Sequence, residues 1–449
     1  MANVIKLRKG LNIKLKGRAT EQSATLGVRG EYALVPEDFA GVTPKVVVSE
    51  GQHVKAGDAL FINKNYPDVK FASPVSGVVT AVLRGERRRV LCVKVKADDT
   101  QEFVDFGVKK VDSLQGREVV DALLEAGLFG YINQLPYAVS TQPKAEPKAI
   151  FVSALRDMPL AGDFEMELKG NETAFQAGLT ALSKIAKVYL GIGRMQSSKA
   201  LTAATSVETY VFDGPCPAGN VGVQVNHIDP VNKGEVVWTV DPTAVIFFGR
   251  LFLEGKVNLV RKVAVAGSMV THPSYVETLV GTPLAAVLEG NLVRLDHVRI
   301  LNGNPLTGRV SAMTDNLGAH TSEVTVIPEG DNVNEAFGWI LPRFKQFSAS
   351  KSYFSWLQGK RDYDLDARIK GGQRHLIMSG EYDRVLPMDI YGEYLIKAII
   401  AGDIDRQEQL GIYEVSPEDF AVAEFVDSSK LELQKIVREG LDILRKENA

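Results

Sequence analysis

Residues 211–231 read VFDGPCPAGNVGVQVNHIDPV, and this stretch decides how the neighbouring segments are interpreted. An apolar run ends at Asp213, and two glycines and two prolines follow within residues 214–219. Because proline fixes its own φ and glycine tolerates backbone angles that other residues avoid, we predict a rigid, sharply bent loop. In α/β proteins a loop at the end of a buried strand often binds a ligand or a partner, and a purely structural turn is the alternative. The candidate ligand or partner loop comprises Gly214, Pro215, Pro217, Gly219 and His227.

Predicted strands and helices alternate along the chain before this loop. That order predicts a parallel, Rossmann-like sheet with the loop at its carboxyl edge. Beyond the loop, Val221, Val223 and Val225 alternate with other residues, which indicates a further strand. The alternating segments before the loop are residues 149–152, 173–185, 186–190, 200–207 and 209–212.

Gly191 and Gly193 follow a predicted strand, as the first two glycines of a dinucleotide-binding motif do. Gln196 occupies the position of the third glycine. No residue about 20 positions further on is a convincing ribose-binding acid. The motif is therefore incomplete, and it gives little support to nucleotide binding.

Residues 45–96 contain short predicted strands separated by glycine and proline corners, which indicates a small barrel or sandwich. The pattern V-x-x-G-x-x-V-x-x-G-x-x-L, followed by S-P-x-x-G-x-V, resembles the biotinyl/lipoyl barrel-sandwich family. In that family the modified lysine stands where this chain has Tyr66, and Lys64 is displaced by two residues. The resemblance implies the fold without the carrier chemistry, with modification of Lys64 as the minor alternative. In the same unit, residues 84–89 read RGERRR, which suits a solvated turn or a contact for an anionic partner or lipid headgroups.

The remainder of the chain divides into a β-rich region and a helical end. The size of residues 257–326 suits a ubiquitin-like or β-grasp module. In the helical end, Ser416 followed by Pro417 predicts a helix start, and Ser429 with Glu432 fits a capping box.

Residues 336–361, AFGWILPRFKQFSASKSYFSWLQGKR, differ from the rest of the chain in composition. Seven aromatic residues fall between positions 337 and 356, five lysines or arginines are present, and no acidic residue occurs. Aromatic rings beside basic side chains are typical of a lipid–water boundary or a protein docking surface. The alternative is the core of a helical domain with a basic rim. The candidate residues for docking on a membrane subunit are Trp339, Arg343, Phe344, Phe347 and Trp356.

Composition and missing motifs limit the kinds of site that this chain can form. The net charge of 52 − 55 = −3 gives no general attraction for nucleic acid. Two cysteines cannot form a four-cysteine zinc or iron–sulfur site, and no hydrolase elbow, zinc-protease motif or Walker loop occurs. We therefore predict no catalytic residue and no metal ligand. His227 beside Asp229 and His320 near Asp315 are interpreted as structural histidines.

The sequence also bears on the cellular compartment. No uncharged apolar run reaches the roughly 18 residues that a transmembrane helix needs, and the N-terminus has no signal-peptide core. The low cysteine content suits a reducing compartment. We expect a soluble or peripheral, cytoplasmic protein.

Four longer motifs converge on one family. They are GP-x-PAG at 214–219, I-x-P-V at 228–231, GQRHLIMSGEYDRVLPMDI at 372–390 and LGIYEVSPEDFAVAEFVDSSK at 410–430. Together with the module order, they make the chain resemble the A subunit of the Na⁺-translocating NADH:quinone oxidoreductase over nearly its whole length. This family is also similar in fold to the flavin subunit of complex I and to the C subunit of the Rnf complex.

The chain departs from these relatives at several positions. Cys216 and Asn226 stand where histidines often occur in the family, and Ala423 and Asp427 stand where the iron–sulfur relatives often have cysteines. The resemblance therefore implies a complex I-like fold that has lost FMN and its cluster.

The resemblance implies a multidomain α/β fold and a role within a membrane complex. The expected function is that of a cofactor-free peripheral subunit on the cytoplasmic side of the bacterial inner membrane. It would dock chiefly on the membrane-embedded B subunit of the complex and contribute to the quinone-reduction end, where quinone would lie at a subunit interface. NADH, flavins, Fe–S centres and quinone would be used in other subunits. The alternative is a stand-alone soluble nucleotide- or flavin-binding oxidoreductase.

The expected domain division has five parts. They are a lead-in that packs on the Rossmann-like domain (1–40), a barrel-sandwich hybrid (41–100), the Rossmann-like domain (101–256), an SLBB-type ubiquitin-like domain (257–330) and a helical domain (331–449).

Overall fold

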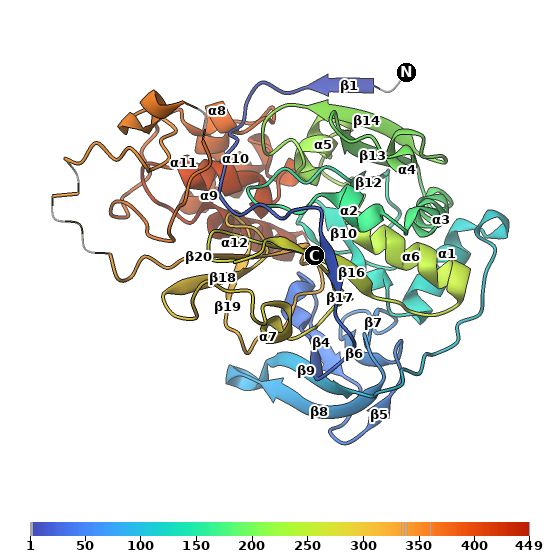
Figure 1. Cartoon of the computed structure of the whole chain (residues 1–449). Helices are drawn as coiled ribbons and strands as arrows, with labels where there is room; N and C mark the ends of the chain where they lie inside the picture. Colours follow the sequence, from blue (N-terminus) through green and yellow to red (C-terminus); the bar gives the residue numbers. More distant parts are fainter. Residues whose placement is uncertain (1–2, 334, 336, 339, 360, 449) are drawn as a thin grey trace.

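A seven-stranded sheet lies at the centre of the computed structural model, which describes residues 3–448 except 334, 336, 339 and 360 (Figure 1). Its strand order is β1-β14-β13-β12-β15-β10-β11, in which the first five strands are parallel and β10 runs antiparallel to both of its neighbours, β15 and β11. The Rossmann-like parallel sheet predicted from the sequence is therefore confirmed. The strands are β1 (Asn3–Lys6), β10 (Ile132–Leu135), β11 (Val139–Ser140), β12 (Ile150–Ser153), β13 (Val188–Gly193), β14 (Glu208–Asp213) and β15 (Val237–Val240).

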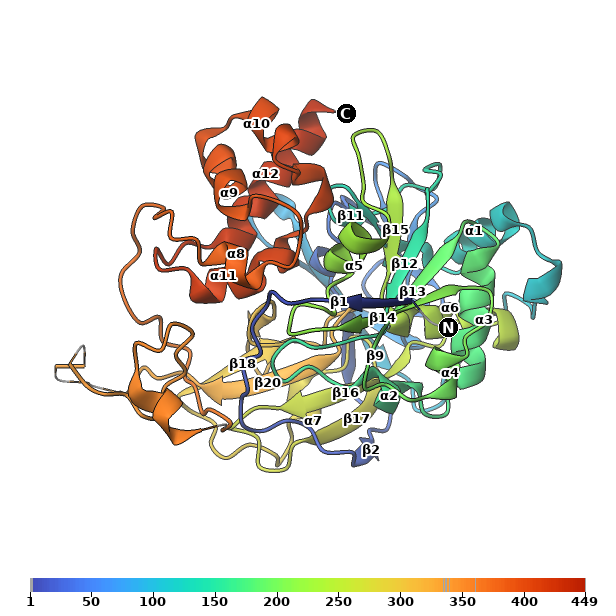
Figure 2. The same ribbon diagram turned by 90° about the horizontal axis from the view of Figure 1, so that it is seen from above.

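Helices cover both faces of this sheet, so the side chains on both sides of its central strands are buried. Ile150 and Val152 of β12 pack into the main core with α3 (Glu172–Ser183) and α6 (Pro242–Glu254). Phe151, which points the other way, belongs to the cluster under α5 (Val221–Ile228). Figure 2 shows α5 and α3 on opposite sides of the strands.

The segment predicted as a strand at Val221–Val225 is helix α5, so that prediction was wrong. Asn220 is extended and the helix begins at the next residue. Gly222, Val223, Gln224 and Val225 are all buried. A short helix that is buried on most sides does not show the apolar spacing that separates a helix from a strand.

The N-terminal barrel-sandwich consists of two small sheets around an aromatic core. The sheets are ordered β3-β9-β8-β5 and β4-β6-β7. Phe71 lies between Phe39 and Phe61, with ring centroids 4.5 and 4.6 Å away. This architecture confirms the predicted barrel-sandwich. The strands are β3 (Glu31–Leu34), β4 (Pro44–Val46), β5 (His53–Val54), β6 (Ala59–Asn63), β7 (Lys70–Ala72), β8 (Gly77–Arg84) and β9 (Val90–Ala97).

A fourth sheet, of six strands, is connected to the central sheet and to the barrel-sandwich by the N-terminal segment. Its order is β19-β18-β20-β16-β17-β2. Residues 3–34 thus give β1 to the central sheet, β2 to this sheet and β3 to the barrel-sandwich. The strands are β2 (Ser23–Thr25), β16 (Val260–Ala266), β17 (Ser274–Leu279), β18 (Val298–Asn302), β19 (Arg309–Ser311) and β20 (Glu323–Pro328).

The C-terminal end is helical, as predicted. Ser416 forms a capping box with Asp419 at the start of the 3₁₀ helix η7 (Pro417–Phe420). The capping box predicted at Ser429 and Glu432 is wrong, because the last helix begins only at Leu433 and the Ser429 hydroxyl accepts a hydrogen bond from the Ile377 N–H. None of the helices in the described ranges has the length and apolar character that a membrane span requires. The helices are α8 (Tyr382–Val385), α9 (Gly392–Ala401), α10 (Ile404–Gln409), α11 (Ala421–Val426) and α12 (Leu433–Glu447).

Candidate functional site

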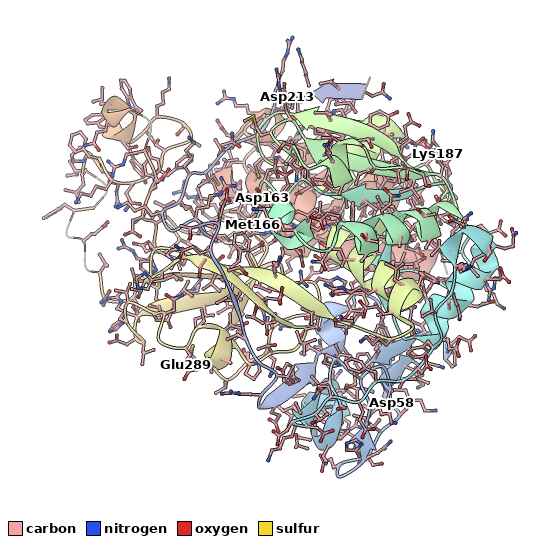
Figure 3. All side chains as sticks on the ribbon, turned by 45° about the vertical axis from the view of Figure 1, so that its right-hand side comes forward. Asp58, Asp163, Met166, Lys187, Asp213 and Glu289 are labelled. Atoms are coloured by element: carbon pink, nitrogen blue, oxygen red, sulfur yellow. The ribbon has the colours of Figure 1, made fainter. Side chains whose placement is uncertain are left out.

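The predicted loop at residues 214–219 follows β14 and is covered by the N-terminal segment. Asp213 ends β14 at the carboxyl edge of the sheet, far from Lys187 at the opposite edge (Figure 3). The Leu11 N–H donates to the Cys216 carbonyl at 2.7 Å, and the Cys216 N–H donates to Oδ1 of Asn12 at 2.9 Å. The Cys216–Pro217 peptide is cis. The loop is therefore closed on one side by the chain itself.

The end of the loop is held by two further segments. The Ser153 hydroxyl donates to the Gly219 carbonyl at 2.7 Å. The Asn220 side chain donates to the Glu418 carbonyl at 3.1 Å, and a Cβ on Gly222 would lie 2.3 Å from Oδ2 of Asp419. The loop thus contacts the N-terminus, the loop after β12 and the C-terminal helices, which favours a structural corner over an open ligand site.

Close packing at Gly219 gives a testable consequence. A Cβ at this position would lie 2.5 Å from the Leu155 carbonyl oxygen. We expect Gly219→Ala to lower the free energy of unfolding by about 1–3 kcal/mol, the usual effect of overpacking. Gly372→Ala is the matched control, because nothing lies within 4 Å of the corresponding Cβ. Urea unfolding of both variants makes the comparison, and equal effects would contradict a closed corner.

Two other sequence candidates near the loop, Gly191 and His227, contact groups of the protein itself. A Cβ on Gly191 would lie 1.9 Å from Oε1 of Gln224, so the missing side chain makes room for Gln224 rather than for a phosphate. Nδ1 of His227 is 2.9 Å from the Val223 carbonyl within its own helix. Asp229 pairs instead with Lys148, at 2.5 Å.

A largely buried cluster of charged side chains, which we call the polar junction, joins the central sheet to β16; the Glu167, Arg156 and Asp241 side chains are 2%, 11% and 32% exposed. Nη1 of Arg156 is 3.1 Å from Oε2 of Glu167, and its Nη2 is 3.4 Å from Oδ1 of Asp241 and donates to Thr243 at 2.8 Å. The Thr243 hydroxyl donates to Glu167 at 2.7 Å, and Arg261 of β16 donates to the Ala319 carbonyl at 3.0 Å. Nearby, Asp163 caps helix α2 (Phe164–Leu168), and the Asp163 N–H donates to the Tyr275 hydroxyl of β17 at 2.7 Å.

Opposite charges in the polar junction offset the effect of burial on one another. Burial disfavours the charge of Arg156, but the Asp241 and Glu167 carboxylates outweigh burial and raise the pKa of Arg156. Burial likewise opposes the charge of Asp241, but Arg156 and Arg261 lower its pKa. Both signs of charge therefore stay ionised inside the protein because each stabilises the other.

The polar junction lies where the order of the parallel strands reverses. Arg156 follows β12 and Asp241 follows β15, two adjacent strands; the strands that follow β12 in the chain, β13 and β14, lie on one side of it, and β15 lies on the other. In open α/β sheets the crevice at this place usually binds the ligand. Here the Arg156 guanidinium crosses it. Sequence patterns did not reveal these residues, because the only local signal was the helix start at Asp241-Pro242, which does not identify a distant partner.

His320 lies beside the polar junction, not with Asp315 as the sequence suggested. Its ring centroid is 5.4 Å from that of Phe39 and 5.3 Å from that of Tyr131. Burial lowers the pKa of His320 to about 4, against the effect of Asp241. Asp315 instead accepts from the Ala312 N–H at 2.9 Å. The interpretation of His320 as a structural histidine stands on this packing.

The lowered pKa of His320 predicts a pH dependence of stability. Between pH about 4 and about 6.5 the unfolded state binds a proton that the folded state does not, so stability is lost as pH falls through this window. His320→Phe keeps a ring between Phe39 and Tyr131 and cannot be protonated. In urea unfolding, we expect the wild type to lose stability relative to the variant between pH 7 and about 5. Burial raises the pKa of Asp157 and of Asp419 to about 6, so these two groups favour the folded state as pH falls. They do so equally in the wild type and in the variant, and their contribution cancels in the difference between the two proteins. A pH-independent difference would contradict this assignment.

The aromatic segment predicted for docking is largely exposed and contains one short helix, η5 (Phe354–Gln358), in its described part. Half-buried side chains anchor it: the Phe347 ring centroid is 5.7 Å from that of Phe425, and Arg343 pairs with Glu335 at 2.6 Å. Trp339 lies outside the described residues. We call the exposed apolar set the docking face; it comprises Phe337, Ile340, Leu341, Phe344, Phe354, Trp356 and Leu357.

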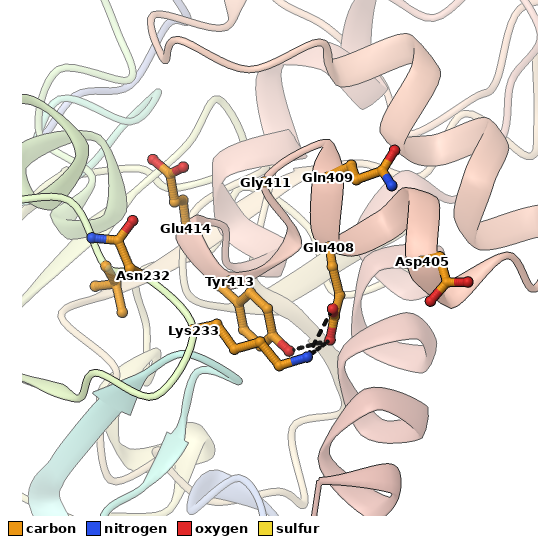
Figure 4. A pocket seen from close by; sticks show the side chains of 9 residues that line it. Asn232, Lys233, Asp405, Glu408, Gln409, Gly411, Tyr413 and Glu414 are labelled. Carbon is orange, nitrogen blue, oxygen red and sulfur yellow. Dashed lines mark hydrogen bonds and ion pairs between the residues drawn. The ribbon is translucent and has the colours of Figure 1, made fainter.

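A surface cavity of about 430 Å³ lies between the segment after α5 and helices α10 to η6 (Ile412–Glu414) (Figure 4). Lys233 binds the Glu408 carboxylate at 2.7 and 2.8 Å, and the Tyr413 hydroxyl donates to the same group at 2.5 Å. Lys233 and Glu408, two of the charged residues that line the cavity, thus satisfy each other. No group of three or more metal-ligating side chains occurs within the part of the chain that the structure describes.

Comparison with known proteins matches this architecture domain by domain. Residues 5–98 match the NqrA N-terminal barrel-sandwich hybrid domain, 114–257 the NqrA second alpha/beta domain and 262–312 the NQRA C-terminal domain. The A subunit of the Na(+)-translocating NADH-quinone reductase from Neisseria meningitidis serogroup A is 33% identical over 448 residues, covering 99% of this chain and 100% of the relative. The chain belongs to this A-subunit family.

Further A-subunit relatives show the same full-length match. Those from Yersinia pestis and Hahella chejuensis are each 32% identical over 449 residues, with 99% of this chain and 100% of the relative covered. The family resemblance drawn from the four sequence motifs is thereby confirmed. Among solved structures, a chain of an air-oxidized NAD+-reducing [NiFe]-hydrogenase aligns with 75% of this chain and 69% of its own, at a TM-score of 0.36 and 12% identity, too low to support an argument.

Proposed function

We propose that this chain is the peripheral A subunit of a Na⁺-translocating NADH-quinone reductase, with no redox cofactor of its own. The observation that carries the proposal is the full-length match to relatives of that name. The proposed role is to dock on the membrane subunits, chiefly the B subunit, from the cytoplasmic side. In this position the chain would help to form the quinone-reduction end, with quinone at a subunit interface.

The polar junction supports the cofactor-free part of the proposal. The place where open α/β sheets usually bind a ligand is spanned by the Arg156 side chain, which bonds Glu167, Asp241 and Thr243. A ligand phosphate or flavin ring there would have to displace a buried ion pair, which is strongly unfavourable. We therefore assign NADH, flavin, Fe–S and quinone chemistry to other subunits.

The docking face supports the peripheral part of the proposal. Phe337, Trp356 and Leu357 are 72%, 50% and 61% exposed. Large apolar side chains that gather on a surface commonly mark an interaction site. We propose that this face binds a membrane subunit, and that the chain is divided into domains at residues 40, 100, 256 and 330.

Affinity purification tests the proposed function. The tagged full chain, recovered from membranes in a mild detergent, is expected to carry hydrophobic subunits with it. After separation from them it should show no flavin absorbance. A chain that is recovered alone, coloured yellow and able to oxidise NADH would instead support a stand-alone flavin- or nucleotide-binding oxidoreductase.

A further inference from the structure

The tip of the β8–β9 hairpin, residues 83–91, concentrates positive charge that the protein neutralises only in part. Four arginines and one glutamate lie between positions 84 and 89. Within the described ranges, only Arg89 of the four pairs with an acid, Glu37 at 2.7 Å. Arg84, Arg87 and Arg88 are exposed and lack such a partner among the described residues. This local excess contrasts with a chain whose net charge is −3.

Two arginines at the tip have an unfavourable backbone conformation. Arg87 and Arg88 have φ angles of 52° and 60°, in the left-handed region that glycine and asparagine occupy more easily. Two successive arginines in this conformation are unfavourable for folding, and such outliers gather at functional positions. The Arg89–Glu37 pair ties the base of the tip to the lead-in segment.

Exposed leucines flank the arginines. Leu83 is 42% exposed and Leu91 is 44% exposed. Leu91 packs beside Gly85, where a Cβ would lie 3.2 Å from its Cδ2, so apolar and cationic groups share one convex tip. Arginine beside exposed leucine suits the boundary between headgroups and acyl chains, where the guanidinium binds phosphate and the leucine enters the apolar layer.

We infer that residues 83–91 bind the surface of a membrane that contains anionic phospholipid. Each basic residue near such a surface contributes favourably to binding, and the leucines add an apolar contribution that salt does not screen. A convex tip with leucines fits a deformable surface better than a groove on an acidic protein or a nucleic acid. In Figure 1 the β8–β9 hairpin lies at the bottom of the molecule, away from the central sheet. The inference does not rest on the proposed function, because the isolated chain can be tested.

Vesicle flotation of the purified full chain tests this inference. We expect binding to vesicles of phosphatidylglycerol and phosphatidylcholine, weaker binding to pure phosphatidylcholine, and weakening by salt. The triple variant Arg84→Gln, Arg87→Gln, Arg88→Gln should lose roughly 10- to 100-fold in affinity for the anionic vesicles. The pair Leu83→Gln, Leu91→Gln should weaken the binding that remains at high salt.

A charge-matched control separates the tip from general electrostatics. Arg117, Arg384 and Arg406 have side chains that are 62%, 70% and 73% exposed, and each pairs with an acid within about one helical turn. Replacing these three by Gln removes the same charge and should leave vesicle binding nearly unchanged. Equal loss in both triple variants, no preference for phosphatidylglycerol, or full binding by the tip variant would overturn the inference. Copurification with membrane subunits remains a separate readout of docking.

Discussion

Replacing Arg156 with methionine should lower the free energy of unfolding by about 3–5 kcal/mol, the effect expected when one partner of a buried ion pair is removed. The Glu167 side chain is only 2% exposed, and its carboxylate would lose the guanidinium 3.1 Å away. Asp241 would lose one of its cationic neighbours. Urea unfolding of the full chain at neutral pH measures the effect.

Two variants separate the buried pair from a general loss of charge. Arg117→Met removes an exposed arginine that pairs with Asp121, and it should change stability by less than about 1 kcal/mol. Adding Glu167→Gln to the Arg156→Met variant removes the stranded charge and should restore part of the lost stability. If Arg156→Met were as mild as Arg117→Met, the polar junction would not be a folding element.

Replacing Phe344, Trp356 and Leu357 together by serine should reduce recovery of the chain with membrane subunits at least about tenfold. Large apolar side chains at the centre of an interface supply most of its binding energy, and each contributes roughly 1.5–3 kcal/mol when fully buried. Their present exposure of 42%, 50% and 61% leaves this area available to a partner. Recovery of hydrophobic subunits with the tagged chain, compared at equal expression, is the measurement.

The matched control removes exposed apolar side chains elsewhere. Leu253, Tyr391 and Ile443 are 44%, 69% and 51% exposed and lie on or next to α6, α9 and α12. Their triple replacement by serine should leave copurification unchanged. Equal loss in the two triple variants would move the interface away from the docking face.

The sequence allowed the sheet and the shape of the loop to be predicted, because both depend on local patterns. Apolar runs such as residues 149–152 and 209–212 became β12 and β14, and the glycines and prolines after Asp213 form a tight, closed loop. Local pattern failed at Val221–Val225, where a helix buried on most sides has no distinctive period.

The polar junction could not be predicted in the same way. Arg156, Glu167, Asp241 and Arg261 are spread over more than 100 positions of the sequence and meet only because β12, β15 and β16 come together. In the aromatic segment, composition indicated a surface but not which rings face solvent. Phe347 is an anchor against Phe425, whereas Phe344 and Trp356 are exposed.

Site-specific photocrosslinking in the assembled membrane complex tests the central claim most directly. A photoreactive amino acid at Trp356 probes the docking face, and one at Lys187, on the far edge of the central sheet, is the control (Figure 3). If the docking face binds the membrane part of the complex, position 356 should crosslink to an integral membrane subunit, whereas position 187 should not. Crosslinks from position 356 to peripheral subunits only, or to none, would contradict the account.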